Sequence, residues 1–396
     1  MKRTNLIRST LGYLNSPNKV ELLSAVFSDA FGPSNRKQKY SLEEHIMATY
    51  HWICAAQDAN PGGGVSGWYS LKDGWGDPYP ETTGYIITSM LALGNFKNIQ
   101  DCIKRAIAMA DWEIDVQLNS GAVRGGTLRT DPSPAVFNTG QVVFGWVRAY
   151  QETADEKYIY AAKCAAEWLL NVQDYDGAWR RFLSPLTTSL VCTFNSRTAW
   201  SLVLLGQVIG EEKYIDSGQK NLEWCLTQQQ PDGWFRNNSF SPNEIPLLHT
   251  IGYVIEGLLE AGILLQSSRF IDSATLALES LLEHLGKDGH LWGRYDSGWK
   301  STTRWRCLTG EAQIALSLLK LYELTREEKY FNGGKLINEQ LMNFQVLNSG
   351  KAEVIGGVKG SHPIWGAYER FSYPNWAAKF FLDSLLIQQS IVDKTL

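Results

Sequence analysis

The stretches Glu156-Lys157-Tyr158, Glu212-Lys213-Tyr214 and Glu328-Lys329-Tyr330 repeat one acidic-Lys-Tyr pattern, and Ser268-Arg269-Phe270 occupies the slot between the last two. The aromatic residues that end these four stretches are 56, 56 and 60 positions apart. A fixed period of this length is typical of stacked copies of one supersecondary unit, each of which buries its apolar face against its neighbours. The repeat therefore predicts a fold built from stacked copies of this unit.

Each of the first three copies continues in the same way. An apolar helical run is followed by a Gln or Leu, then by Asp-Gly and a nearby Trp, over Gln173 to Trp179, Gln230 to Trp234 and Leu285 to Trp292. A second helical run follows each of these loops. The repeating unit is therefore predicted to be a pair of helices joined by a glycine-containing loop.

Two sets of helices follow from apolar spacing of 3.6 residues. Six amphipathic runs are predicted at about 42–57, 99–117, 155–173, 211–229, 268–285 and 327–345. Six more evenly apolar runs are predicted at about 83–95, 138–152, 196–209, 250–265, 309–324 and 374–388, and polar clusters that begin them suggest N-caps. Because an apolar helix must be surrounded, the second set should line a barrel that the first set shields. We predict an all-α fold, an (α/α)6 toroid over residues 41–396, with residues 1–40 as an N-terminal extension packed on it.

Composition narrows the functional classes. The net charge of −4, from 37 basic and 41 acidic residues, argues against a nucleic-acid partner. The six cysteines lie far apart, which suggests neither a disulfide framework nor a zinc site, and we expect no metal and no cofactor. Residues 1–14 lack the pattern of a signal peptide, and no apolar stretch approaches membrane-spanning length, so we expect a cytoplasmic protein without membrane insertion.

The functional residues are expected at one end of the barrel. Connections from amphipathic to apolar helices are long, about 10 to 28 residues, whereas the returns are about 2 to 5. Long loops that share one end of a fold commonly carry the binding site. The candidates there are Trp75, Tyr79, Glu81, Asn138, Gln141, Asn195, Arg197, His249, Tyr253, Arg304, Trp305, His362, Trp365, Tyr368, Tyr373 and Asn375.

The types of these residues predict a sugar or oligosaccharide ligand that is anionic. Six helix N-termini that meet at one mouth carry positive partial charge, and Arg197, Arg304 and Arg306 would add to it. Aromatic faces with interspersed amides suit a polyhydroxylated ring. Together these features point to acidic sugars.

The catalytic candidates each have a structural alternative. His249, just before an almost uncharged helix, is interpreted as a general base or as a loop hydrogen bonder. Tyr373 and Tyr368 are candidate proton donors, although tyrosine also packs well. Glu81 caps its helix, or it forms the carboxylate pair of a glycosidase with Glu369; Asp77 and Glu311 are the alternative pair. His362 is a candidate second histidine.

Several enzyme classes can be set aside on the sequence. The repeat is similar to that of class II terpene cyclases, but the Asp-X-Asp-Asp proton donor of those enzymes is missing. The zinc set of prenyltransferase β-subunits and lanthionine cyclases is not matched, since the cysteines mostly fall on the outer helices. No dinucleotide-binding glycine motif and no phosphate loop occurs.

The chain resembles (α/α)6-toroid sugar enzymes along nearly its full length. Thr309-Gly310-Glu311-Ala312-Gln313 with Tyr322-Glu323-Leu324-Thr325 resembles uronyl C5-epimerases and alginate or heparin lyases. Residues 63–69, Asn195-Ser196-Arg197 with Trp200, and His249 before Glu256 resemble N-acylglucosamine 2-epimerases. The strings Phe137-Asn138-Thr139-Gly140-Gln141 and Tyr373-Pro374-Asn375-Trp376-Ala377 are similar to a group of bacterial proteins encoded among surface-polysaccharide genes. The resemblance implies that His249 is a catalytic base and Arg197 a substrate clamp.

Three functions are consistent with these residues. The first is an enzyme of surface-polysaccharide metabolism that abstracts the proton beside a uronate carboxylate or sugar carbonyl, as a lyase or epimerase, with His249 as base and Tyr373 as acid. The second is a glycoside hydrolase that uses paired carboxylates. The third is a non-catalytic glycan-binding protein.

Overall fold

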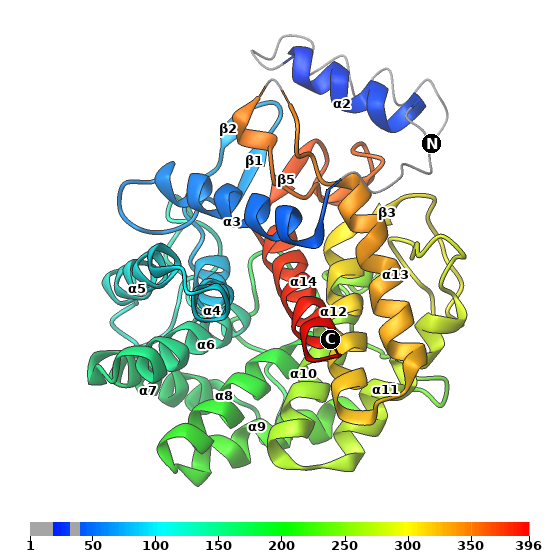
Figure 1. Ribbon diagram of the computed structural model, residues 1–396. Helices are drawn as coiled ribbons and strands as arrows, with labels where there is room; N and C mark the ends of the chain where they lie inside the picture. Colours follow the sequence, from blue (N-terminus) through cyan, green and yellow to red (C-terminus); the bar gives the residue numbers. More distant parts are fainter. Residues whose placement is uncertain (1–18, 32–39, 350, 396) are drawn as a thin grey trace.

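The computed structural model of the chain describes residues 19–31, 40–349 and 351–395, and it confirms the all-α toroid (Figure 1). The inner helices are α4 (Pro80–Lys97), α6 (Val136–Thr153), α8 (Ser196–Ile209), α10 (Leu248–Leu265), α12 (Leu308–Thr325) and α14 (Asn375–Thr395). The outer helices are α3 (Leu42–Asp58), α5 (Gln100–Asp115), α7 (Glu156–Val172), α9 (Glu212–Leu226), α11 (Ser268–Glu283) and α13 (Glu328–Phe344). The remaining helix, α2 (Lys19–Phe31), belongs to the predicted extension and lies outside the ring at the top of Figure 1. The rest of that extension, 1–18 and 32–39, lies outside the described residues.

The inner helices form a closed ring. Consecutive inner helices pack on one another from α4 round to α14, and α14 packs in turn against α4. Each outer helix packs on the inner helix that precedes it, and α3 packs on α14. The sixth hairpin is therefore assembled from the first outer helix and the last inner helix, which closes the ring.

The turns at one end of the ring are short and alike. The inner helices α4, α6, α8, α10 and α12 end in left-handed cap residues, namely Asn98, Ala154, Gly210, Gln266 and Arg326. A left-handed residue reverses the chain at once, so two linking residues suffice before each next outer helix begins. The predicted short returns are confirmed.

The acidic-Lys-Tyr repeat joins neighbouring outer helices. The hydroxyl groups of Tyr158 and Tyr214 donate to carboxylates on the preceding outer helices, over 2.7 Å to Asp111 and 2.5 Å to Glu167. Tyr330 makes the equivalent bond on α11. In the copy that carries a phenylalanine, an arginine of α11 instead forms a bidentate pair with a carboxylate of α9. The repeat therefore exists because each outer helix must be held to the one before it.

A second repeated contact fixes the long loops. The side-chain amide of Gln173 donates to the carbonyl of Gly177 in the following loop, over 2.9 Å, and to a carbonyl of the next outer helix. Gln57, Gln117 and Gln229 make the same pair of bonds in their own hairpins. The predicted equivalence of Gln230 with Gln173 is wrong by one position, because Gln229 makes the equivalent bonds.

The inner helices approach one another closely at glycines. A Cβ on Gly84 would lie 2.6 Å from the backbone of Val142, and one on Gly140 would lie 2.8 Å from that of Thr198. The threonines that start these helices hold the loops: the Thr139 hydroxyl accepts from the backbone of Val123 over 2.9 Å. The expected N-caps are not formed, because α4, α6, α8, α10 and α12 show no side-chain cap hydrogen bond.

Short strands lie at the loop-rich end of the ring. Strands β1 (Trp68–Ser70), β2 (Gly74–Trp75) and β5 (Ser372–Pro374) form an antiparallel sheet in the order β2-β1-β5. Strands β3 (Arg306–Cys307) and β4 (Ser361–His362) form a second ladder. Within the part of the chain that the structure describes, α10 alone is long and apolar enough to cross a membrane, but 78% of that stretch is buried in the ring.

Candidate functional site

The centre of the ring is occupied by Arg197, from the first turn of α8. Its guanidinium carbon lies 5.2 to 5.9 Å from the centroids of five aromatic rings. These rings come from α4, α6, α8, α10 and α14, and they are Tyr85, Phe144, Trp200, Tyr253 and Phe380. Because five of the six inner helices contribute, this position marks the axis of the toroid. Arg197 itself is 1% exposed.

Arg197 is held by protein partners. Its Nε donates to Oε1 of Gln141 over 2.8 Å, and its Nη1 forms an ion pair with Glu256. Burial would raise the pKa of Glu256, but the charges of Arg197 and Lys379 keep it below its ordinary value. The guanidinium is also enclosed by five aromatic rings, so it is not open to a substrate carboxylate. The expectation that Arg197 is a substrate clamp is therefore not supported by the geometry.

His249 lies next to this pair, in the first turn of α10. Its Nδ1 is 2.7 Å from Oε1 of Gln313. Because an amide oxygen accepts, Nδ1 carries the proton and Nε2 carries the lone pair. Burial lowers the pKa of His249 to about 4, and the charge of Arg197 contributes to the shift. His249 is therefore a neutral imidazole at physiological pH.

Glu81, in the first turn of α4, is the second titratable group at the axis. Burial raises its pKa to about 7, although the Tyr79 hydroxyl, which donates to Oε2 over 2.8 Å, and Arg197 oppose the shift. A carboxyl group with this pKa holds and releases a proton near neutral pH. Glu81 is thus suited to proton transfer, beyond a role as a cap.

Two tyrosines surround His249. The ring centroid of Tyr253 is 4.3 Å from that of His249, and the ring centroid of Tyr368 is 5.5 Å from it. Burial raises the pKa of Tyr253, and the next largest cause is the negative charge of Glu81. The Tyr368 hydroxyl accepts a bond from Nε1 of Trp376 over 2.8 Å. We call Glu81, Arg197, His249, Tyr253, Glu256 and Tyr368 the axial cluster.

Several amides among the predicted site residues have unused hydrogen-bonding capacity. Within the described residues, both polar atoms of the Asn138 side chain, Nδ2 of Asn195 and Nε2 of Gln313 are buried without a hydrogen-bond partner. Asn138 lies beside the Tyr79 hydroxyl without forming a bond of ordinary geometry. Buried polar atoms without partners are uncommon and costly. They are atoms to which a polyhydroxylated ligand or water would bind.

The axial cluster is nearly closed. Its members expose 8% of their surface or less. A cavity of about 840 Å³ lies instead to one side, beneath α2, and is lined by α13 and by the loops before α12 and α14. The open mouth that the sequence analysis expected at the ring axis is therefore not what the structure shows. The reason is that large aromatic side chains fill the space that the loops surround.

The structure separates predicted residues that the sequence analysis grouped together. Tyr373 lies in β5, lines the side cavity and is close enough to Asp29 for that charge to raise its pKa after burial. The rings that contact His249 are Tyr253, Tyr368 and Phe380, so the expected base–acid pair of His249 and Tyr373 is not formed.

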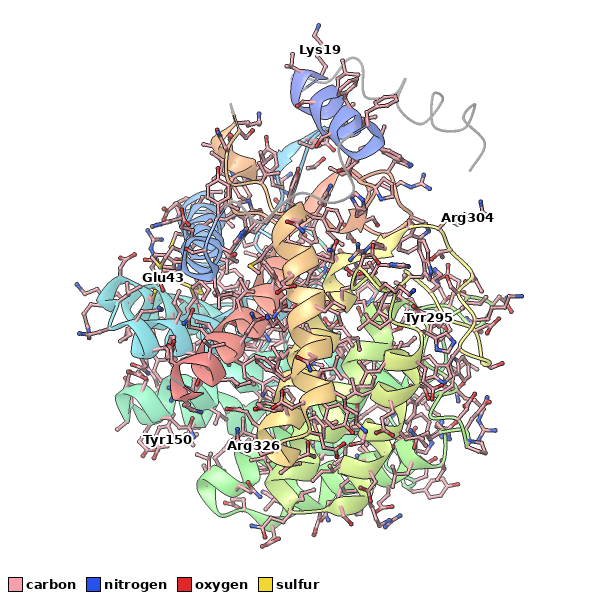
Figure 2. All side chains as sticks on the ribbon, turned by 45° about the vertical axis from the view of Figure 1, so that its right-hand side comes forward. Lys19, Glu43, Tyr150, Tyr295, Arg304 and Arg326 are labelled. Carbon is pink, nitrogen blue, oxygen red and sulfur yellow. The ribbon has the colours of Figure 1, made fainter. Side chains whose placement is uncertain are left out.

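The other predicted loop residues lie away from the axis. Arg304 and His362 also line the side cavity, and Figure 2 shows Arg304 at the edge of the molecule. The Trp75 ring packs against Trp52 and Tyr69. Trp305 and Trp365 are partly buried against the core. Asn375 donates from Nδ2 to Ser66 and Thr82, which fixes the start of α14.

The other acids of the two predicted carboxylate pairs lie in different surroundings. Glu311 is fully buried and accepts a bidentate pair from Arg306, and Asp77 pairs with Arg129 over 2.8 Å. Burial raises the pKa of Glu369 to about 7. Among the residues that the structure describes, no group of three or more His, Cys, Asp or Glu could hold a metal ion.

Sequence reasoning missed the importance of Glu256, which holds Arg197. A signal was present, because Glu256 is an isolated charge in the otherwise apolar run 251–259 of an inner helix. A lone carboxylate in such a run predicts a buried partner of opposite charge.

No protein-family model matches the sequence, and no curated protein sequence matches it. Solved structures do. A heparin-specific unsaturated glucuronyl hydrolase superposes with a TM-score of 0.71 at 15% identity, covering 89% of this chain and 98% of its own. A D-mannose isomerase gives 0.68 at 15% identity, with coverages of 90% and 97%. The cellobiose 2-epimerase of Bacillus thermoamylovorans gives 0.67 at 12% identity, with coverages of 87% and 98%. These similarities establish the (α/α)6 toroid as the fold.

Proposed function

We propose that the protein is a carbohydrate-active enzyme that moves a proton at a sugar carbon within the axial cluster. The observation that carries the proposal is the contrast, within one buried cluster, between His249, whose pKa burial lowers to about 4, and Glu81, whose pKa burial raises to about 7. Two titratable groups whose pKa values are driven apart by their surroundings are typical of an acid–base pair. The fold is also shared with a glucuronyl hydrolase, an isomerase and an epimerase that act on sugars.

In the proposed reaction, Nε2 of His249 removes the proton from the carbon beside a carboxylate or carbonyl of the sugar. The electron pair of the broken C–H bond moves toward that carboxylate or carbonyl oxygen. The Glu81 carboxyl then returns a proton to the carbon, which gives epimerisation, or to a leaving oxygen, which gives elimination. Tyr253 and the unpartnered amides of Asn138 and Asn195 hold the sugar.

Arg197 has a positioning role in this scheme. Its ion pair with Glu256 fixes a positive charge beside His249, and that charge disfavours protonation of the imidazole. The base thus stays unprotonated without a contact between Arg197 and the substrate.

Substrate entry requires that the cover over His249 moves. The segment 365–371 carries Tyr368 onto His249, and its residues Glu369 and Phe371 have left-handed φ values of 46° and 55°. Such a conformation is strained for residues with a side chain, so we propose that this segment is the part that opens.

The test is incubation in deuterated water with a panel of hexuronate oligosaccharides, amino sugars and neutral disaccharides. Deuterium at a sugar carbon, or a new C=C absorbance, is the expected result. His249→Gln should lower turnover by about 10²- to 10⁴-fold, whereas His284→Gln, at the exposed end of α11, should not. Because Glu81 must be protonated, turnover should also fall as the pH rises above about 7.

A second candidate is a glycoside hydrolase in which Glu81 is the general acid. The pKa of about 7 favours this role, and the ionised Glu256 gives a carboxylate of contrasting pKa within the same cluster. New reducing ends without deuterium at carbon would favour this candidate. The surface-polysaccharide setting and the cytoplasmic location expected from the sequence stay predictions in either case.

A further inference from the structure

The side cavity beneath α2 is a second candidate binding site. Its volume of about 840 Å³ falls within the ordinary range of small-molecule sites, about 300–1,000 Å³. Its walls come from α2, from α13, and from the loops that precede α12 and α14. The polar and aromatic residues of these walls include Asp29, Trp292, Arg304, Arg306, Asn343 and His362.

The floor of the cavity is the β3–β4 ladder. Arg306 and His362 are directly opposed in this ladder, so their side chains leave the same face. The His362 ring stacks on Phe344 at 4.0 Å with an interplanar angle of 23°, and the Arg306 guanidinium carbon lies 4.8 Å from the centroid of that same ring. Both side chains are therefore fixed by one aromatic ring at the end of α13.

Glu311 fixes this floor from below. It accepts bonds from Nε and Nη2 of Arg306, each over 2.8 Å, and one from the backbone of Leu291 over 2.9 Å. One buried carboxylate thus positions both Arg306 and the start of the segment that carries Trp292. The pair with Glu311 engages two of the five N–H groups of Arg306, so a ligand can meet a guanidinium that is already ordered.

The rim adds charge and an apolar face. Arg304 is exposed on the loop before β3 and lines the cavity. Trp292 is partly buried, with the His290 ring 4.8 Å from it in an edge arrangement. The cavity wall holds two acids, and both are already paired: Asp29 with Lys359 and the backbone of Ile364, and Asp288 with the His290 ring, whose Nδ1 lies 2.5 Å from Oδ1. The field toward a ligand is therefore positive.

We propose that the side cavity binds a carboxylated sugar unit, at a site separate from the axial cluster. Arg306 and Arg304 bind the carboxylate, Trp292 packs against the sugar ring, and the Asn343 amide meets a hydroxyl. The preference for an anion follows from the two arginines alone, whereas the choice of a sugar rests on the proposed function. The site would hold an acidic saccharide chain at the loop-rich end of the toroid.

The experiment is titration calorimetry of the full chain with trigalacturonate, and with maltotriose as the neutral probe. Trigalacturonate should bind, maltotriose should bind at least about tenfold more weakly, and added salt should weaken the binding of the acid. Arg304→Gln should weaken trigalacturonate binding by about three- to tenfold, and Trp292→Ala by about tenfold. Because Arg304 is exposed, its variant should fold even if that of Trp292 does not.

Two control variants locate the binding. Arg326→Gln makes the same change of charge at the opposite end of the ring, where Figure 2 shows this residue, and should leave binding unchanged. His249→Gln at the axis should retain binding that depends on Arg304.

Equal affinity of wild type and Arg304→Gln, or no binding of trigalacturonate at millimolar concentration, would overturn the proposal. So would loss of all binding in His249→Gln, since that places the acid at the axis. Binding that depends on Arg304 in a protein without turnover would support this site while removing the proposed function. Turnover in a protein whose trigalacturonate binding is unchanged by Arg304→Gln would support the proposed function while removing this site.

Discussion

The axial cluster and the side cavity use similar residues for different ends. At the axis, Arg197 is enclosed by five aromatic rings and neutralised by Glu256. In the side cavity, Arg304 is exposed and Arg306 keeps N–H groups beyond its pair with Glu311. The axis is built from helices that surround it on all sides, whereas the cavity is built from loops, one outer helix (α13) and the outlying helix α2. The charge of Arg197 at the axis is therefore used within the protein, whereas the charges of the cavity arginines are available to ligands.

The buried carboxyl groups of the two regions show the same difference. Burial raises the pKa of Glu81 to about 7, because Tyr79 and Arg197 compensate only in part. Burial acts in the same sense on Asp29, but the ammonium group of Lys359 and the neighbouring His362 hold the pKa of Asp29 well below its ordinary value. A carboxyl group in contact with a cation is thus an ion, and one beside a phenol is a proton donor.

The largest effect is expected when the positive charge of Arg197 is removed from the axis. Arg197→Leu should lower the free energy of unfolding by about 3–5 kcal/mol, since it leaves Glu256 buried without its partner. Urea denaturation measures the change. The matched control is Arg269→Leu, which breaks an exposed pair with Glu223 and should cost about 0.5 kcal/mol. Equal losses in the two variants would show that Arg197 is not the buried centre of the ring.

A second test concerns the pH dependence at the axis. Because the pKa of Glu81 is raised from 4.5 to about 7, its contribution to stability is fully present below pH 4.5 and is lost as the pH rises through 7. Relative to Glu81→Gln, wild type should lose about 3 kcal/mol of unfolding free energy between pH 4.5 and pH 8. Urea denaturation of both proteins across that range gives the difference. Parallel pH profiles would contradict the assignment.

The smallest effect is expected at the outlying helix. Asp29→Asn removes the ion pair with Lys359 but keeps an acceptor for the backbone of Ile364. Because α2 lies outside the ring, the loss should be local, with faster hydrogen exchange over residues 19–31 and a change of about 1 kcal/mol or less in global unfolding. A global loss as large as that of Arg197→Leu would show that α2 is part of the toroid core. The Asp29 contribution should be present above pH 3.8 and disappear in acid.

The fold could be predicted because it follows from periodic contacts. The spacing of Tyr158, Tyr214 and Tyr330 reflects bonds between neighbouring outer helices, and each bond needs only one hydroxyl and one carboxylate. Gln173 likewise joins its helix to a nearby loop glycine. Such contacts leave a regular trace in the chain.

The arrangement of the site could be predicted only in part. His249 and Glu81 were identified because both begin inner helices, and that position follows from the repeat. The separation of Tyr373 from His249 could not be predicted, because it depends on how the long segment before α14 pairs with β1. The closure of the axis could not be predicted either, because it depends on where side chains such as Tyr368 lie once the loops have packed.

Because α3 packs on α14, the ring can close only after α14 has been synthesised. The partner of α3 is translated more than 300 residues later. Until then the chain forms an open arc, with apolar helix faces exposed at both ends. Chains that terminate early can never shield those faces. We therefore expect nascent and truncated products to depend on chaperones, and the mature ring to resist proteolysis once α14 is seated.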